Sequence, residues 1–312
     1  MPRTHKPRAG SLQFWPRSRS KIHYANVKAW AKKDKVLAFA GYKAGMTHVI
    51  ENNPKSKVAK TRSVPVTIIE CPPLKPLSLR FYKKTPYGAQ LLSEITSKKL
   101  NKELSKKIRL PKAEKEQKTP ESYDYLKLAV YTQPKLTNLG KKKPDIFEIG
   151  IPNNIEEAKK LLESELKLEE IFKPGQHVDI HSITKGKGFQ GPVKRFGISL
   201  KSHKSEKKRR SAGNLGSFTP RKTDHRVPQH GQLGYFKRTE YNKLVYLIDS
   251  DPKKVNQLGG IKGYGELKND FILIKGSVGG PKKRLIIFSE TIRNKKDKAA
   301  PEILQISQES KQ

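Results

Sequence analysis

Residues 185–238 read KGKGFQGPVKRFGISLKSHKSEKKRRSAGNLGSFTPRKTDHRVPQHGQLGYFKR and interrupt a chain that is otherwise rich in short strand-forming runs. This stretch holds fifteen lysines and arginines against two acids, Glu206 and Asp224, with eight glycines and three prolines. Between Leu200 and Gln232 the few apolar residues follow neither a helical nor a strand period. A segment of this kind buries too little apolar surface to offset the entropy of ordering it.

We therefore expect residues 185–238 to form a long irregular basic loop that becomes ordered against a polyanion through phosphate contacts. The alternative is a solvated run of charge on a disordered loop.

The composition of the whole chain points to the same class of partner. The 312 residues, enough for roughly two domains, carry a net charge of +37, which a bound polyanion would neutralise. Nucleic acid fits better than a membrane, because no apolar run approaches the ~20 residues needed to span a bilayer. The first twenty residues lack the apolar core of a secretory signal. The single cysteine, Cys71, excludes an internal disulfide and fits a reducing compartment.

The first 35 residues are expected to form a basic N-terminal arm that binds RNA. They contain ten lysines and arginines against one acid, Asp34, and Phe14, Trp15, Tyr24 and Trp30 lie among them. Basic side chains can neutralise phosphates while aromatic rings stack on exposed bases. The alternative is a frayed basic tail, which is usually poor in aromatic residues.

Strand patterns dominate the next segment and the last third of the chain. VLAFAGYKAGMTHVIE at 36–51 predicts a hairpin turning at Gly41–Gly45 or a bulged strand pair, and VPVTIIE at 64–70 and residues 77–82 predict further strands. Residues 176–184, 243–249, 271–275 and 285–288 are also strand-like, with glycine turns between the later ones. Short strands at this spacing are typical of a barrel.

The middle of the chain, 84–174, is expected to be an α+β insertion. Leu91, Leu92 and Ile95 suggest the start of a helix, and residues 125–131 and 147–151 are strand-like. Asn154 is placed to cap a helix with Glu157 three residues on, followed by an apolar stripe. Residues 145–170 hold eight acids and three lysines, so this region is expected to face solvent or a protein neighbour.

Two motifs have the spacing of a nucleotide or metal site. The glycines of GKGFQG at 186–191 match a dinucleotide fingerprint, but Pro192 and a sequence without a helical stripe follow them, and no suitably placed acid comes later. His177, Asp179 and His181 alternate along a strand, yet no further cluster supplies a fourth metal ligand, so an exposed polar strand face explains them better. The sequence predicts no enzyme.

Several long stretches resemble one family: PRAGSLQFWPRSR at 7–19, GYKAGMTH at 41–48, VDIHSITKGKGFQGPVKRFG at 178–197, NLGSFTPRK at 214–222, VPQHGQLGYFKRTEYNK at 227–243 and NDFILIKGSVGGPKKR at 269–284. The chain resembles the universal third protein of the large ribosomal subunit in its archaeal–eukaryotic form. It departs from the family at the loop tip, where Phe218 stands in place of a tryptophan and keeps a stacking face without the indole N–H.

The resemblance implies a mainly β fold, a six-stranded split β-barrel of the translation-protein type with an α+β insertion domain. It implies a structural, assembly-supporting role in the cytoplasm, with the arm and loop in large-subunit ribosomal RNA, the loop tip near the peptidyl transferase centre, and a neighbouring ribosomal protein as partner. The expected divisions are the arm 1–35, the barrel parts 36–83 and 175–290 with the loop 185–238, the insertion 84–174, and a mobile charged tail 291–312.

The residues expected to contact RNA are basic and aromatic side chains of the arm and loop: Arg3, Lys6, Arg8, Trp15, Arg17, Arg19, Lys187, Phe189, Lys194, Arg195, Lys208, Arg209, Arg210, Phe218, Arg221, Arg226, Tyr235 and Arg238. A second set would let the RNA backbone approach closely, namely Gly186, Gly188, Gly191, Gly213 and Gly216. No catalytic residue, metal, cofactor, membrane or small-molecule substrate is expected. The other hypotheses are a chromatin-like nucleic-acid-binding protein and a phosphate-handling enzyme built on the 186–191 glycines.

Overall fold

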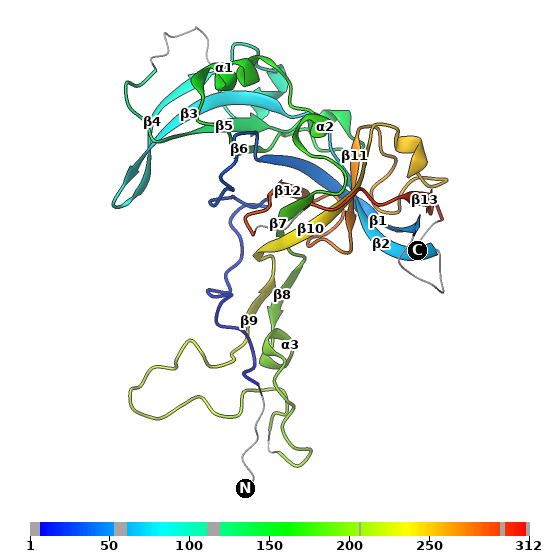
Figure 1. Cartoon of the computed structure of the whole chain (residues 1–312). Coiled ribbons are helices and arrows are strands. Elements are labelled where there is room, and N and C mark those ends of the chain that lie inside the picture. Colours follow the sequence, from blue (N-terminus) through cyan, green and yellow to red (C-terminus); the bar gives the residue numbers. More distant parts are fainter. Residues whose placement is uncertain (1–6, 53–60, 111–118, 206, 294–296, 310–312) are drawn as a thin grey trace. The chain divides into compact units, whose positions relative to one another are not determined.

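The computed structural model of the protein describes residues 7–52, 61–110, 119–205, 207–293 and 297–309, and it is built mainly from strands (Figure 1). The strands are β1 (Ala38–Asn52), β2 (Thr61–Glu70), β3 (Lys75–Thr85), β4 (Gly88–Thr96), β5 (Tyr125–Tyr131), β6 (Ile146–Gly150), β7 (His177–Ile183), β8 (Gly186–Gln190), β9 (Gly231–Gly234), β10 (Lys237–Asp249), β11 (Phe271–Lys275), β12 (Leu285–Glu290) and β13 (Ile303–Ile306). The α-helices are short: α1 (Ile155–Glu163), α2 (Leu168–Ile171) and α3 (Pro192–Phe196). Single turns of 3-10 helix are η1 (Lys102–Lys106), η2 (Pro134–Leu136) and η3 (Pro252–Lys254).

The largest sheet has seven strands in the order β12-β7-β10-β11-β2-β1-β13. Strand β12 also pairs with β1, with Ala38 opposite Ser289 and Tyr42 opposite Leu285, so the run from β12 to β1 is joined at both ends. Apolar side chains from several of these strands, including Phe39, Ile68 and Phe288, are fully buried in one core. The expectation of a mainly β fold is confirmed.

Strand β1 corrects the expected hairpin. Residues 38–52 form one continuous strand, and the pairing register with β2 shifts between Lys43 and Gly45. The bulge alternative is therefore confirmed, and the hairpin alternative is wrong. Gly41 is needed for close packing rather than for a turn, because a Cβ there would lie 2.6 Å from the Glu70 carbonyl oxygen and from Cys71 Sγ.

A second sheet has the order β4-β3-β5-β6. Leu91, Leu92 and Ile95, whose spacing suggested a helix, lie in β4, where Leu91 pairs with Tyr82 of β3. The helix prediction is wrong because pairing with the preceding strand, in a hairpin that brings Thr85 opposite Gly88, overrides a weak local period. Strand β3, which we expected in the barrel part 36–83, pairs with β4 and β5 and so belongs to the second sheet.

One carboxylate, that of Glu148, ties three strands of this second sheet together. It accepts hydrogen bonds from Arg80 at 2.8 Å, the Tyr82 hydroxyl at 2.6 Å and Lys127 at 2.9 Å. Burial by itself would raise the pKa of Glu148, but the hydrogen bonds from Tyr82, Lys127 and Arg80 outweigh it and hold the pKa below its ordinary value of 4.5.

Helix α1 begins as its sequence predicts. The Asn154 side chain accepts a hydrogen bond from the Glu156 amide at 3.1 Å, and its amide group donates to the Glu157 carboxylate at 3.2 Å. Ala158 and Leu162 are the buried residues of the helix. The capping prediction is confirmed, and α1 presents its acids to the outside.

The polar residues of β7 are not exposed, contrary to our expectation. His177, Asp179 and His181 are all buried. The Asp179 carboxylate accepts hydrogen bonds from the backbone amides of Asn242 at 2.8 Å and Ile292 at 3.0 Å. Neighbouring strands cover both sides of β7, so its polar groups bond to protein rather than to water. Within the described ranges, no group of three or more His, Cys, Asp or Glu side chains could hold a metal ion.

The last residues contain one strand. In the segment 291–312, which we expected to be a mobile charged tail, β13 pairs with the far end of β1, Ile306 lying opposite Val49. No helix in the described part of the chain is long and apolar enough to cross a membrane.

Candidate nucleic-acid interface

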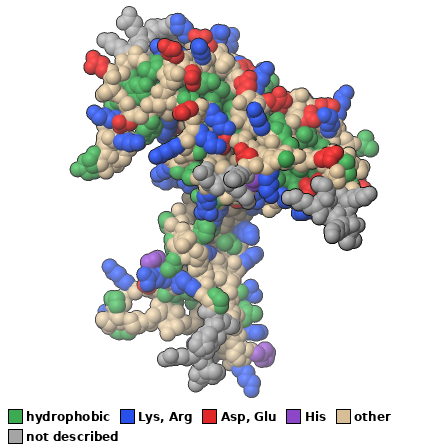
Figure 2. Space-filling model, viewed as in Figure 1, with side chains coloured by type: hydrophobic (Ala, Val, Ile, Leu, Met, Phe, Trp, Pro, Cys, Tyr) green, Lys and Arg blue, Asp and Glu red, His purple; other side chains and the backbone are tan. Residues whose placement is uncertain are grey.

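Residues 1–22 and 183–237 form one compact unit, here called the basic unit, and residues 23–182 and 238–312 form another, the larger unit. The basic unit holds 20 of the 66 lysines and arginines but only 2 of the 29 acids in 77 residues. Figure 2 shows the consequence on the visible face, where acidic side chains gather over the larger unit. Positive charge without matching acids is the electrostatic footprint of a nucleic-acid-binding surface.

The base of the basic unit is a ribbon of two antiparallel strands, β8 and β9, with Gly186 opposite Gly234 and Gln190 opposite Gly231. Gly234 has a φ of +72°, and a Cβ there would lie 2.1 Å from the Lys185 carbonyl oxygen. Only glycine fits this crossing. The ribbon lets a long irregular segment leave and return at the same place.

The GKGFQG motif lies in this ribbon rather than in a nucleotide-binding loop. Helix α3, which we did not expect, begins directly after Gly191 but has only five residues. Strand β8 pairs with β9 in antiparallel fashion, whereas a dinucleotide fingerprint requires a parallel βαβ unit.

Arg195 stabilises the end of the loop, where the chain enters β9. Its guanidinium donates hydrogen bonds to the carbonyl oxygens of Gln232 and Gln229, both at 3.0 Å. A Cβ on Gly231 would lie 3.2 Å from the centre of the same guanidinium. The planar fork of arginine suits two carbonyl acceptors better than an ammonium would.

The N-terminal arm packs onto α3. Arg17 donates a hydrogen bond to the Arg195 carbonyl oxygen at 2.7 Å, and its guanidinium lies 4.2 Å from the centre of the Phe196 ring. Trp15 stacks on Phe196 at 6.2 Å between ring centres and meets His225 edge-on at 5.5 Å. These contacts join the N-terminal arm to α3, although Arg17 and Arg195 are 178 positions apart in the chain.

Burial affects the pKa of both guanidiniums. Burial lowers the pKa of Arg17. Burial, and then the neighbouring charge of Arg17, lower the pKa of Arg195. A depressed pKa means that the charged form is less favourable here than in water.

Two further arginines of the arm also reach the return segment of the loop. Arg8 donates a hydrogen bond to the Arg226 carbonyl oxygen at 3.0 Å, and the Arg19 guanidinium lies 5.4 Å from the centre of the Tyr235 ring. The Ser20 amide donates to the Tyr235 carbonyl oxygen at 2.9 Å. The first part of the expected arm therefore belongs to the basic unit, whereas residues 23–35 belong to the larger unit, where Ala25 and Val27 are buried.

Other predicted residues point outward. The exposed cations of the loop are Lys187, Lys194, Lys208, Arg209, Arg210, Arg221 and Arg226. Phe189 is 72% exposed and Phe218 80% exposed, which is unusual for phenylalanine. Phe189 lies 5.1 Å from the His230 ring, and the Arg221 guanidinium lies 5.4 Å from the Phe218 ring. These rings offer stacking faces beside positive charge.

A hollow of about 690 Å³ lies within the loop. Lys208, Arg209 and Arg210 line it together with His230, and Leu215 adds an apolar surface. The sequence predicts that the three consecutive cations lie together, but it does not predict that His230 and Leu215 lie beside them. Only the return path of the loop does so.

The remaining predicted positions are distributed as follows. Arg3 and Lys6 lie outside the described residues. Arg238 is half-buried in β10 and belongs to the larger unit. Of the close-approach glycines, Gly188, Gly191, Gly213 and Gly216 have open space where a side chain would stand, and Gly186 faces the Tyr235 ring. The loop also has exposed cations that are absent from the predicted set: Lys185, Lys204, Lys207, Lys222 and Lys237.

Comparison with known proteins agrees with this surface. The sequence model of the family described as ribosomal protein L3 matches residues 1–312. The chain belongs to the ribosomal protein L3 family. The large ribosomal subunit protein uL3 of Methanobrevibacter smithii is 42% identical over 334 residues, which cover 100% of this chain and 99% of the relative. The protein of the same name from Methanococcus aeolicus is 41% identical over 326 residues, covering 99% and 98%, and that from Methanothermobacter thermautotrophicus is 41% identical over 335 residues, covering 100% and 99%.

Membership of the ribosomal protein L3 family confirms the resemblance drawn from the sequence motifs. It also makes the chain a structural protein rather than an enzyme. The motif stretches at 7–19, 178–197, 214–222 and 227–243 contribute most of the basic unit, so the stretches that carry the resemblance also carry the charged surface.

Proposed function

We propose that this protein is a structural constituent of the large ribosomal subunit in the cytoplasm, where it binds large-subunit ribosomal RNA and supports subunit assembly. The observation that carries the proposal is the charge of the basic unit, 20 cations against 2 acids in 77 residues, in a chain of the ribosomal protein L3 family. Such a surface gains affinity by releasing counterions from phosphates.

The basic residues divide into two roles. Arg17 and Arg195 brace the loop and arm through hydrogen bonds to backbone carbonyls. The exposed cations, above all Lys208, Arg209 and Arg210, face outward and are placed to contact phosphates. A brace made of arginines keeps the irregular backbone in one conformation while adding to the positive field that attracts RNA.

The exposed aromatics supply the stacking contacts of this interface. Phe218, at the loop tip that reaches toward the peptidyl transferase centre, keeps a ring on which a base can stack. Base–aromatic stacking contributes ~1–3 kcal/mol per base, so one such ring can fix a loop tip in folded RNA. A tryptophan at this position would add an N–H donor, which Phe218 lacks.

We also infer that β12, β7, β10, β11, β2 and β1 form the split barrel that the family resemblance implies, since pairing runs from each to the next and back from β1 to β12. The sheet β4-β3-β5-β6 with α1 and α2 is the inserted α+β part, which begins at β3 rather than at residue 84. The barrel holds both ends of the basic loop, because β7 leads into the loop and β10 continues from it.

Salt titration of RNA binding by the full chain tests the role of the loop. Replacing Lys208, Arg209 and Arg210 with glutamine should make the slope of log K against log salt shallower by roughly 2 to 3, about 0.7 to 0.9 for each lost phosphate contact. Removing three exposed charges of the larger unit, at Lys142, Lys143 and Lys253, should change the slope less. An unaltered slope in the 208–210 variant would rule out this loop as the phosphate-binding element.

Cell fractionation tests the ribosomal assignment itself. The protein should comigrate with large subunits in a sucrose gradient and stay with them at moderate salt. Comigration with DNA instead would support the chromatin-like alternative and overturn the proposed function.

A further inference from the structure

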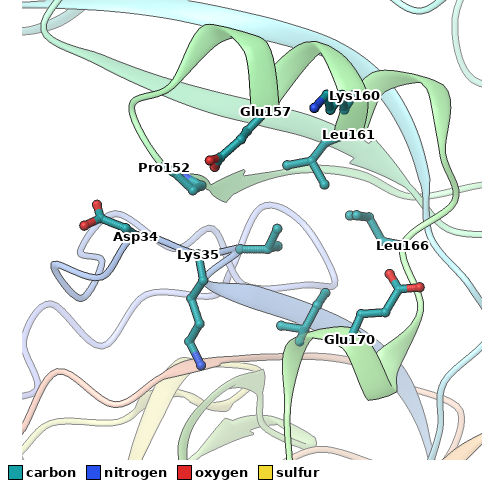
Figure 3. Close-up of a pocket in the computed structure, with 10 residues that line it drawn as sticks. Asp34, Lys35, Pro152, Glu157, Lys160, Leu161, Leu166 and Glu170 are labelled. Carbon is teal, nitrogen blue, oxygen red and sulfur yellow. The ribbon is translucent and has the colours of Figure 1, made fainter.

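The larger unit carries a groove whose chemistry is opposite to that of the basic unit. A cavity of about 360 Å³ lies between the chain entering β1, the helix α1 and the helix α2 (Figure 3). Its floor is apolar, formed by Val36, Pro152, Leu161, Leu166 and Ile171. We call this surface the acidic-rimmed groove, because the side chains above the floor are mainly carboxylates.

Three separate segments contribute these carboxylates: Asp34 precedes β1, Glu157 belongs to α1 and Glu170 to α2. All three residues are exposed, and within the described ranges none of them forms an ion pair with a lysine, arginine or histidine.

The two lysines at the groove do not neutralise the rim. The Lys35 ammonium is bound to the buried Glu290 carboxylate, and Figure 3 shows the side chain directed away from the cavity. Lys160 therefore remains as the single rim cation against three carboxylates among the residues that line this cavity. The rim keeps a negative charge in a protein whose net charge is +37.

Helix capping explains only part of this arrangement. Glu157 lies in the first turn of α1, where a carboxylate is favourable, and accepts a hydrogen bond from Asn154. Asp34 lies in no helix, however. The apolar floor also needs another reason, since Val36 and Leu161 remain half-buried beneath an open cavity.

The charge of the rim decides which kind of partner can lie there. RNA phosphates would be repelled by three carboxylates within one small surface. A protein segment bearing lysine or arginine would be attracted, and an apolar side chain beside those cations would cover the floor. Such segments are abundant among RNA-binding proteins, because their own charge neutralises phosphate.

We propose that the acidic-rimmed groove binds a lysine-bearing segment of another protein of the large subunit. One apolar side chain of that segment lies on Leu161 and Val36, and its cations pair with Asp34, Glu157 and Glu170. The inference rests on the proposed function, since the partner is a neighbour in the assembled particle. It decides between solvent and a protein neighbour, the two surroundings expected for the acidic stretch 145–170, in favour of a protein neighbour at this groove.

Carboxyl labelling tests this proposal in the assembled particle. Purified large subunits and the free protein are treated with a water-soluble carbodiimide and glycine ethyl ester, and modified peptides are quantified by mass spectrometry. Asp34, Glu157 and Glu170 should be modified several-fold more slowly in the subunit than in the free protein. Glu163, an exposed acid of α1 outside the groove, is the matched control and should react at similar rates in both states.

Carbodiimide without the ester identifies the occupant. It should join the groove carboxylates to lysines of a different protein in the subunit. A link to Lys160, which lines the same groove, is expected with or without a partner. Protection of the groove without a crosslink to another protein, crosslinks to a second copy of this chain, or RNA protections there would overturn the proposal.

A charge variant tests whether the carboxylates hold the segment. In subunits carrying Glu157→Gln and Glu170→Gln, loss of two exposed ion pairs should raise the labelling rate of the remaining Asp34 about fivefold. Glu163→Gln should leave that rate unchanged. If the double variant also leaves it unchanged, a basic segment does not occupy the groove. Failure of the protein to enter subunits would instead refute the proposed function, so the two failures are distinguishable.

Discussion

Neighbouring residues in helix α3 should respond in opposite ways to mutation. Arg195 donates two hydrogen bonds to the carbonyl oxygens of Gln229 and Gln232, whereas Lys194 is exposed at the surface. Arg195→Lys keeps the positive charge but cannot reproduce the planar fork, so it should lose at least one of these bonds. Lys194→Gln removes a charge and disturbs no contact that holds the loop.

The structure gives the size of the effect. A hydrogen bond from a charged donor contributes about 1.5 to 3 kcal/mol, and we take the lower value because Arg195 is only half-buried. Losing one bond should then increase local opening of the strand β9 roughly tenfold. The mutation should hardly change the salt dependence of RNA binding, because the charge remains.

Hydrogen exchange of the Gly231–Gly234 amides in the free full-length protein measures this opening. Protection should fall about tenfold in Arg195→Lys and stay constant in Lys194→Gln. The salt slope of RNA binding should become shallower by about 0.7 to 0.9 in Lys194→Gln alone. Unchanged protection in Arg195→Lys would show that the guanidinium does not brace the loop and would refute the division between bracing and binding residues.

Three further changes test other parts of the structure. Gly234→Ala should destabilise the β8–β9 ribbon by at least ~2 kcal/mol, because φ is +72° and the new Cβ would lie 2.1 Å from the Lys185 carbonyl oxygen. Gly213→Ala is the control for the ribbon, since a Cβ at Gly213 has no atom within 4 Å. It should leave the exchange of the ribbon amides unchanged and weaken RNA binding, because the added methyl group obstructs close approach of the RNA backbone. The pKa of Glu148 is lowered by its three donors against the effect of burial, so its stabilising contribution is complete above about pH 4.5 and lost as the pH falls through the folded-state value. Chemical unfolding against pH should therefore show a loss of stability in acid that Glu148→Gln reduces, and an unchanged profile would contradict the assignment. Asp179→Ala removes the acceptor of the Asn242 and Ile292 amides, two partly buried hydrogen bonds, and should lower the unfolding free energy by ~2 kcal/mol, with thermal unfolding as the measurement.

The strands that carry their own local signal could be predicted from the sequence. The β-branched runs of β2 and β11 and the capped start of α1 at Asn154 need no distant partner to be recognised. The secondary structure of elements with a weak local signal could not be predicted in this way. Leu91, Leu92 and Ile95 have a helix-like spacing, yet β4 forms because β3 offers an edge to pair with.

The candidate interface divides in the same way. The sequence by itself determined where the positive charge lies, because charge follows composition and needs no fold, and it determined that residues 185–238 could not form a core. Only the tertiary structure decided which of those charges face outward. Arg17 and Arg195 are 178 positions apart, and nothing in the local pattern of either indicates that they meet on Phe196. Contacts between residues so far apart in sequence depend on how the chain returns through the β8–β9 ribbon. Strand pairing and packing determine that path, and the residues adjacent in sequence do not.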